Sequence, residues 1–344
     1  MRFPGRTRAL EAFAILLLAS CGGSATSPGP ASPPPPPVPP PAPPPPPPPP
    51  PSPDHTLFVS DVGVGQFGVL SYSSDSSGNV SPLATIRGSN TGLYFPLGLA
   101  VDTAGLVYVA NYGPAAAGIT MYARGATGNV APVRRIAGTN TRLFYPLSIA
   151  VTASGKIYAL NSFDTITVYA AGASGNAAPV ARIAGSNTGL DGPGGIAVDA
   201  SGRLYVANSK TLSILEYAAG ANGNVAPIST IHGSNTQLTG PSGVAVDAAG
   251  RVYVADNSSN SLLVFAAGSS GNSAPVARIS GTTTKLNLPV GIGVDRQGRV
   301  YAVNNNVTRV TGYAASANGN APPAILISGS NTGMSVPAGL AVAH

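Results

Sequence analysis

The 344-residue sequence has no tryptophan, a single cysteine and few charged residues, which make up 9% of it. One cysteine cannot form a disulfide within the chain, so the fold must be stable without one. Beyond the first twenty residues glutamate occurs only at Glu216, although long helices are normally rich in it. These shortages exclude a disulfide-stabilised scaffold and a largely helical protein.

The residues that are abundant are small or β-branched. From residue 56 onward the chain is rich in Gly, Ala, Ser, Asn, Thr and Val, which favours many short strands joined by turns. The net charge is +6, but the basic residues are scattered, apart from the neighbours Arg134 and Arg135. Because no basic stripe is present, we expect no nucleic-acid partner.

The N-terminus has the features of an export signal. Arg2, Arg6 and Arg8 precede a short apolar stretch at 12–19, which is too short to span a bilayer. The segment ends Leu18-Ala19-Ser20-Cys21 and resembles the bacterial lipobox. Residues 1–20 are therefore predicted to be a lipoprotein signal peptide. The alternative is an ordinary secretory signal with an incidental cysteine.

The lipobox resemblance implies that cleavage leaves Cys21 at the N-terminus with a diacylglycerol on its sulfur. The expected partner is then a membrane, in the envelope of a bacterium. The residue after the cysteine is Gly22 and not an aspartate. In a host with two membranes this implies sorting to the outer one, with the protein facing the periplasm or the exterior.

A proline-rich segment separates Cys21 from the rest of the chain. Nearly every residue between Pro28 and Pro53 is proline, and such a run cannot bury a core. A polyproline helix rises about 3.1 Å per residue, so the run would span roughly 80 Å. We interpret residues 21–55 as a disordered or extended stalk. The alternative is a recognition segment for PxxP-binding modules.

Residues 56–344 contain an internal repeat. Its marker is a Gly-[Ser/Thr]-[Asn/Thr]-Thr motif that recurs every 47 to 50 residues, at Gly88, Gly138, Gly185, Gly233, Gly281 and Gly329. Each unit contains four short apolar segments, clearest around Val244-Ala245-Val246, Val252-Tyr253-Val254, Leu262–Phe265 and Val276–Ile279. Four strands at this period predict the blades of a β-propeller.

Turn residues separate the segments. Asp247-Ala248-Ala249-Gly250 predicts a turn in which the Asp side chain accepts a backbone hydrogen bond, and Asp102, Asp199 and Asp295 begin equivalent turns. A Gly-x-x-Gly-Asn segment, as at 172–176, follows the third strand. We expect both kinds of turn on one face, and the Gly-Ser-Asn-Thr loops on the opposite, upper face.

The repeat P-x-G-[IVL]-A-V-D-x-x-G-x-[IVL]-Y-V-A-[ND] resembles the NHL repeat over nearly all of 57–344. The usual Asn and Arg before the third strand are present only as fragments, at Asn260 and Arg309. The chain's last residues align with a first strand, whereas residues 56–61 align with a second strand. The sequence thus predicts an all-β, six-bladed propeller of four-stranded antiparallel blades, closed by the last strand in the first blade.

Two sets of equivalent residues occur where a propeller could bind a ligand. The amides and carboxylates that end the second strands are too far from the axis to share one Ca²⁺, so we expect them to form Asx turns: Asp61, Asn111, Asn161, Asn208, Asp256 and Asn304. The residues expected at the channel mouth carry no acid, base or histidine: Leu97, Leu147, Gly194, Ser242, Val290 and Ala338.

The propeller resembles six-bladed lactonases and lyases, which place Glu or His residues around the channel mouth. Here Glu216 falls in a third strand. His55, His232 and His344 are not spaced along the chain as the ligands of one metal ion would be. We therefore expect no catalytic residue, no metal and no cofactor. A metal-dependent hydrolase or lyase with an atypical site is the alternative, and a structural filler in an envelope assembly is the third hypothesis.

Comparison of the blades reveals one sector that departs from the repeat. Aromatic residues occur in the upper loops of the second and third blades: Tyr94, Phe95, Tyr112, Phe144, Tyr145 and Phe163. Exposed aromatics favour a protein or glycan partner, although the same rings could pack gaps between blades. The resulting prediction is a monomeric, non-catalytic binding or scaffold propeller displayed on a lipid anchor.

Overall fold

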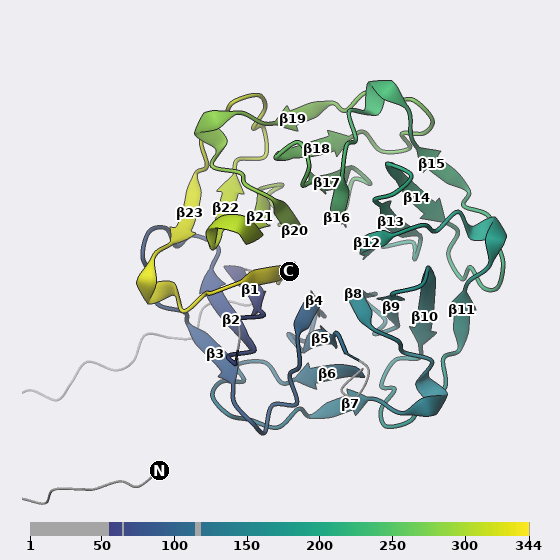
Figure 1. The fold of residues 1–344 in the computed structure, drawn as a ribbon, viewed down its shortest axis with the longest axis vertical. Coiled ribbons are helices and arrows are strands. Elements are labelled where there is room, and N and C mark those ends of the chain that lie inside the picture. The colour runs from purple at the N-terminus through teal and green to yellow at the C-terminus, as the bar shows by residue number, and fades with distance from the viewer. Residues whose placement is uncertain (1–54, 64, 114–117, 344) are drawn as a thin grey trace, which may run out of the picture. The chain divides into compact units, whose positions relative to one another are not determined.

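The computed structural model describes residues 55–63, 65–113 and 118–343. Within them the chain forms six four-stranded sheets that surround a central axis (Figure 1). Neighbouring strands in every blade are antiparallel, as Val254 opposite Leu263 illustrates. The predicted all-β, six-bladed propeller is confirmed. The proposed signal peptide, Cys21 and the proline-rich segment lie outside the described residues.

The strands of each blade are given from the axis outward. Blade I contains β24 (Pro337–Val342), β1 (Thr56–Asp61), β2 (Gly68–Ser73) and β3 (Ala84–Arg87). Blade II contains β4 (Pro96–Val101), β5 (Val107–Asn111), β6 (Gly118–Tyr122) and β7 (Arg134–Ile136). Blade III contains β8 (Pro146–Val151), β9 (Ile157–Asn161), β10 (Thr165–Tyr169) and β11 (Ala181–Ile183).

The second half of the ring repeats this plan. Blade IV contains β12 (Pro193–Val198), β13 (Leu204–Asn208), β14 (Ser213–Tyr217) and β15 (Ser229–Ile231). Blade V contains β16 (Pro241–Val246), β17 (Val252–Asp256), β18 (Ser261–Phe265) and β19 (Ala277–Ile279). Blade VI contains β20 (Pro289–Val294), β21 (Val300–Asn304), β22 (Arg309–Tyr313) and β23 (Ile325–Ser328).

The described helices are single 3₁₀ turns: η2 (Thr139–Thr141), η3 (Ser186–Thr188), η4 (Ser234–Thr236), η5 (Thr282–Thr284), η6 (Asn305–Val307) and η7 (Ser330–Thr332). Within the described ranges, no helix has the length and apolar character needed to cross a membrane.

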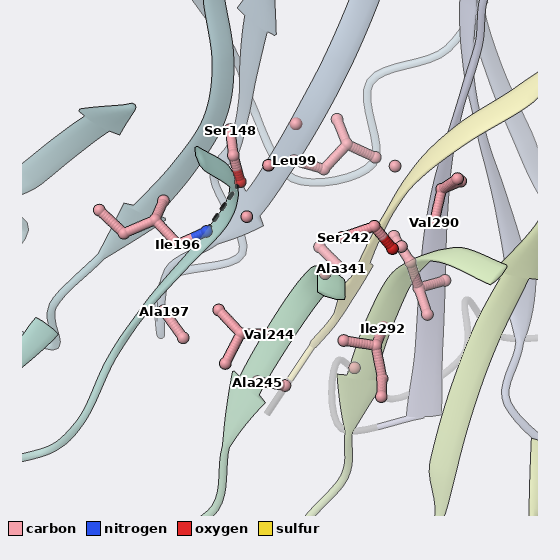
Figure 2. A pocket seen from close by; sticks show the side chains of 18 of the residues that line it. Leu99, Ser148, Ile196, Ala197, Ser242, Val244, Ala245, Val290, Ile292 and Ala341 are labelled. Atoms are coloured by element: carbon pink, nitrogen blue, oxygen red, sulfur yellow. Dashed lines mark hydrogen bonds between the residues drawn. The ribbon is translucent and has the colours of Figure 1, made fainter. Parts of the chain in front are cut away.

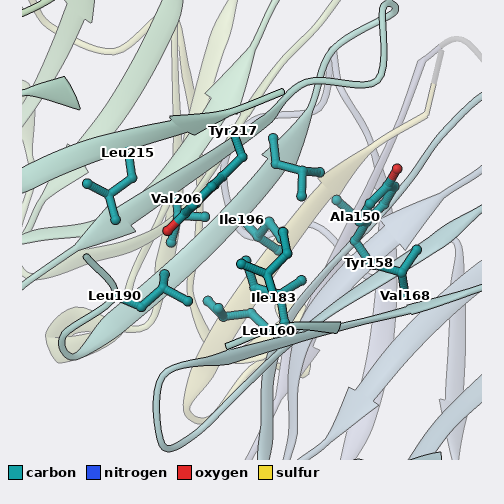
Figure 3. Close-up of a cluster of buried hydrophobic side chains, with 12 residues drawn as sticks. Ala150, Tyr158, Leu160, Val168, Ile183, Leu190, Ile196, Val206, Leu215 and Tyr217 are labelled. Carbon is teal, nitrogen blue, oxygen red and sulfur yellow. The ribbon is translucent and has the colours of Figure 1, made fainter. Parts of the chain in front are cut away.

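The hydrophobic core lies between blades. Six clusters of buried side chains each join two neighbouring blades. In the cluster between blades III and IV, Leu160 and Ile183 pack with Val206 and Tyr217 (Figure 3). Because burying one such side chain contributes about 1.5–3 kcal/mol, the apolar faces of the blades bind the ring together.

Glycine lets the innermost strands approach one another. A Cβ atom on Gly243 would lie 2.6 Å from the carbonyl oxygen of Val290 in the next blade. The same holds around the ring: at Gly339 a Cβ would lie 2.0 Å from the Leu97 oxygen. Blade III has Ser148 at this position. In the five blades that have glycine at this position, backbone packing at the axis leaves no room for a Cβ atom.

The last strand closes the ring. β24 pairs with β1, with Val59 opposite Leu340, and completes blade I beside β2 and β3. In Figure 1 the yellow C-terminal strand accordingly lies beside the purple N-terminal one. This is the closure that the strand count predicts, and it covers an edge of β1 that would otherwise be open.

The outer edges are covered by the neighbouring blade. Gly128, between β6 and β7, forms a parallel bridge with Ile86 in β3, and equivalent bridges occur around the ring, including Gly78 with Ile327. The adjacent Asn129 Oδ1 accepts a hydrogen bond from the amide of Asn90, at 2.7 Å. The predicted placement of the Gly-Asn segments on the lower face is therefore wrong. They lie along the rim because the fourth strand offers unpaired backbone groups there.

Candidate binding surface

The upper face is formed by two kinds of loop. One leads from the outermost strand of a blade into the next blade and is called the leading loop; the other is the hairpin between the second and third strands. In blade II the amide of Tyr112, in the hairpin, donates to the carbonyl of Phe95, in the leading loop, at 3.1 Å. In blade III Ser162 makes the equivalent bond to Tyr145. The two loops of each blade therefore form one surface.

A buried side chain at the end of the second strand fixes each leading loop. Asn111 Oδ1 accepts from the amide of Tyr94 at 3.0 Å, and Asn161 Oδ1 accepts from the amide of Phe144 at 3.2 Å. The predicted Asx turns are therefore wrong for these residues, because the acceptor reaches 17 positions back along the chain. Among the hydrogen bonds of the described residues, Asp256 is the member of this set that also accepts from a following amide, that of Ser259.

The leading loops hold aromatic residues in a strained backbone conformation. Phe95 and Tyr145 have φ angles of 43° and 48°, and Gly192 adopts 64° at the same position in blade IV. A left-handed conformation costs a residue with a Cβ atom roughly 1–2 kcal/mol. Phe95 and Tyr145 therefore occupy a position whose left-handed backbone conformation favours glycine.

The first aromatic cluster lies between blades I and II. Phe95 lies 4.6 Å from Phe67 and 5.2 Å from Tyr94, measured between ring centroids. Phe67 belongs to the hairpin of blade I and was missed by sequence reasoning. Aligning 62–67 with the other hairpins would have identified it. Tyr94 and Phe95 are 41% and 42% exposed, so they both pack across the blades and face solvent.

The second cluster lies between blades II and III. Tyr112 lies 4.8 Å from Tyr145 across the blades, Tyr145 lies 4.8 Å from Phe144, and Phe144 lies 5.3 Å from Phe163. Tyr112 and Tyr145 are half-buried, whereas Phe144 is 48% exposed and Phe163 is 74% exposed. The contacts group the six predicted residues into two neighbouring clusters, each with an exposed edge.

The central channel differs in character from this surface. It has a volume of about 450 Å³, and its lining includes all six residues expected at the channel mouth. Figure 2 shows aliphatic side chains such as Val244 and Ile292 around it, with Ser148 accepting from the Ile196 amide at 3.4 Å. No acid, base or histidine is among the residues that line it. The lining therefore offers no general acid or base.

Comparison with known proteins identifies the fold of the chain and one sequence repeat. The family model of the NHL repeat matches residues 238–265, which span the three inner strands of blade V. Two solved structures resemble the whole ring. A chain in the crystal structure of a nidogen/laminin complex has 17% identity and a TM-score of 0.56, with 84% of this chain and 98% of that chain covered.

A protein of unknown function from Bacteroides caccae has 12% identity and a TM-score of 0.58, with the same coverage of both chains. No curated protein matches the sequence. The chain is an NHL-repeat-like six-bladed β-propeller. At these identities the two structures establish its architecture alone.

The described glutamate and histidines of the NHL-like propeller lie apart from one another and do not line the central channel. Glu216 pairs with Arg203 at 2.9 Å in blade IV, His55 lies 3.6 Å from Asp75, and His232 is exposed beside β15. Among the described residues, no group of three or more His, Cys, Asp or Glu side chains is placed to hold a metal ion. His344 lies outside the described ranges.

Proposed function

We propose that this propeller is a non-catalytic binding module held in the bacterial cell envelope by a lipid on Cys21. The observation that carries the proposal is the group of exposed rings on the upper face of blades II and III. Phe163, at 74% exposure, has no packing role that requires so large an apolar surface in water. Exposed aromatic residues are favoured anchors for partners.

The loops that carry the rings are suited to binding because they are rigid. Each is fixed by a buried amide, as Asn161 fixes Phe144, and by a backbone bond to the hairpin, as Ser162 bonds to Tyr145. A preformed surface loses little conformational entropy when it binds. The similar chain from the nidogen/laminin complex comes from a complex between proteins, which supports a scaffold with a macromolecular partner.

The anchor and stalk complete the proposal. The Leu18-Ala19-Ser20-Cys21 motif supports lipidation of the cysteine that precedes the proline run, and an extended stalk would hold a monomeric propeller away from the bilayer. Growth of expressing cells with an alkyne-labelled fatty acid tests the anchor. The wild-type protein should carry the label and sediment with membranes, whereas Cys21→Ser should do neither. An unlabelled wild-type protein would overturn the anchor.

Photocrosslinking in intact cells tests the binding surface. A benzoyl-phenylalanine at position 163 should form a discrete adduct, whereas the same residue at Leu212, in the hairpin of blade IV, should form little. Equal adducts at both positions would contradict a dedicated sector. Stoichiometric Zn²⁺ or Ca²⁺ in the purified protein, lost together with a hydrolytic or lyase activity, would overturn the non-catalytic assignment.

A further inference from the structure

A groove opens beside the second aromatic cluster, within blade III. Its volume is about 1000 Å³, and the leading loop, the hairpin, the segment before β11 and β11 itself all line it. Phe144 and Phe163 contribute their rings, and Arg142 and Arg182 contribute two positive charges. No acidic residue belongs to the lining. The groove therefore combines an aromatic wall with an uncompensated positive charge.

The two arginines occupy positions that are paired elsewhere in the ring. In blade V the equivalent residues are Gln237 and Arg278, and Arg278 Nη1 donates to Gln237 Oε1 at 2.9 Å. Blade III has arginine at both positions, so the intramolecular acceptor is lost. Within the described part of the chain, the guanidinium groups of Arg142 and Arg182 have no hydrogen-bond or ion-pair partner.

Asp164, the acidic residue next to the groove residue Phe163 in the sequence, bonds to blade IV. Asp164 follows Phe163, and its Oδ1 accepts from the amide of Gly192 at 3.0 Å. Arg142 adopts a left-handed φ of 58°, and the equivalent residue in blade IV is a glycine, Gly189. Two neighbouring like charges without a partner repel each other, and an anionic ligand group would relieve that repulsion.

We infer that this groove binds an acidic glycan, a saccharide chain that carries carboxylates such as those of uronic acids. The inference rests on the proposed binding function and names its ligand class. Arginine recognises a carboxylate with two parallel hydrogen bonds. The apolar face of a sugar ring packs on Phe144 or Phe163, and Thr165 and Asn140 offer polar groups to its hydroxyls.

The covered edge of β11 disfavours an extended acidic peptide as the ligand. Peptides commonly bind by adding a strand to a free sheet edge. Here Gly223 of blade IV already occupies that edge, donating its amide to Arg182 O at 2.8 Å and accepting from the Ala184 amide at 3.1 Å. A ligand in the groove must therefore be recognised by the protein's side chains, which can bond to the hydroxyls and carboxylates of a saccharide.

Titration calorimetry on the purified full-length protein in detergent tests the inference. A galacturonic acid tetramer should bind, whereas a galactose tetramer, a glutamate tetrapeptide and a single-stranded oligonucleotide should bind at least tenfold more weakly. Arg142→Gln and Arg182→Thr copy residues of blades V and IV, so the fold should tolerate them. Each should weaken binding about tenfold, the usual effect of losing a charge-assisted hydrogen bond.

Lys285→Gln, at the position equivalent to Arg142 in blade VI, is the matched control and should leave binding unchanged. Phe163→Leu removes the aromatic ring but keeps an apolar side chain, and it should weaken binding to both acidic and neutral saccharides. Absence of binding, tighter binding of the peptide or oligonucleotide, or equal affinity in the arginine variants would each overturn the inference. A position-163 adduct persisting in cells despite such a result would leave the proposed function standing.

Discussion

Val59, in the first strand of the propeller, lies opposite Leu340 in the last strand. This pairing joins the two ends of the domain within blade I, and Leu340 and Val342 are also part of the core between blades I and VI. A chain that ends at Val336 lacks β24 and exposes both β1 and this core. We expect it to lose cooperative thermal unfolding, as measured by circular dichroism, while Leu340→Ala should remain folded but lose about 2–5 kcal/mol. A truncated chain that melts like the full-length protein would show that the closure is dispensable.

A tyrosine at the end of the third strand anchors the leading loop in five blades. Tyr217 donates to the carbonyl of Thr188 at 2.6 Å, and burial raises its pKa, so the hydroxyl stays protonated. Blade V has Phe265 instead. Tyr217→Phe should lower the free energy of unfolding by about 1 kcal/mol, and Phe265→Tyr should raise it by a similar amount. Urea denaturation measures both; a destabilised Phe265→Tyr would show that blade V has no acceptor in reach.

A side chain at the axial glycines should destabilise the protein. Gly243→Ala places a Cβ 2.6 Å from the oxygen of Val290 and should destabilise the protein by about 1–3 kcal/mol. Ser148→Ala, at the equivalent position in blade III, removes only a long hydrogen bond to Ile196 and should have a much smaller effect. The comparison uses melting temperatures. Equal losses would mean that the inner strands separate without cost.

Asp256 should give stability a dependence on pH that its asparagine counterparts lack. Burial alone would raise its pKa, but hydrogen bonds from Thr239, Gly240 and Ser259 outweigh burial and hold the pKa below its ordinary value. A carboxyl with a lowered folded pKa stabilises the protein above the unfolded value of about 3.9, and this contribution is lost as pH falls through the folded pKa.

Asp256→Asn should therefore be less stable than the wild type at pH 7, and the difference should shrink as pH falls below about 4. Urea midpoints at several pH values measure this, and Asn304, at the same position in blade VI, shows that the fold accepts an amide. A difference that grows on acidification would contradict the account.

The repeat made most of the architecture predictable. A period of 47 to 50 residues with four apolar segments fixed the blade, and aligning residues 56–61 with a second strand fixed the closure. These inferences succeed because each depends on a local pattern that the chain repeats. Residues that act across distance were misjudged: Asn111 bonds 17 positions back, and Asn129 bonds 39 positions back, to the loop that joins blades I and II.

The candidate surface was only partly accessible to sequence reasoning. Comparing blades located the aromatic residues, because they depart from the repeat, but the balance between packing and exposure depends on the three-dimensional arrangement. Tyr145 is half-buried while Phe163 is largely exposed. The arginine pair was missed as well, although comparing Arg142 and Arg182 with Gln237 and Arg278 would have revealed it. Its significance depends on the contact between Gln237 and Arg278, which becomes apparent only in the folded structure.

The most direct test of the binding role combines Phe95→Ser and Phe144→Ser in one protein and measures partner capture by crosslinking in intact cells. The amount of folded protein and the melting temperature serve as reference. We expect capture to be lost while the melting temperature remains close to that of the wild type, because both rings are nearly half exposed. A strong fall in melting temperature with capture per folded molecule unchanged would contradict it, and would assign the rings to packing between blades.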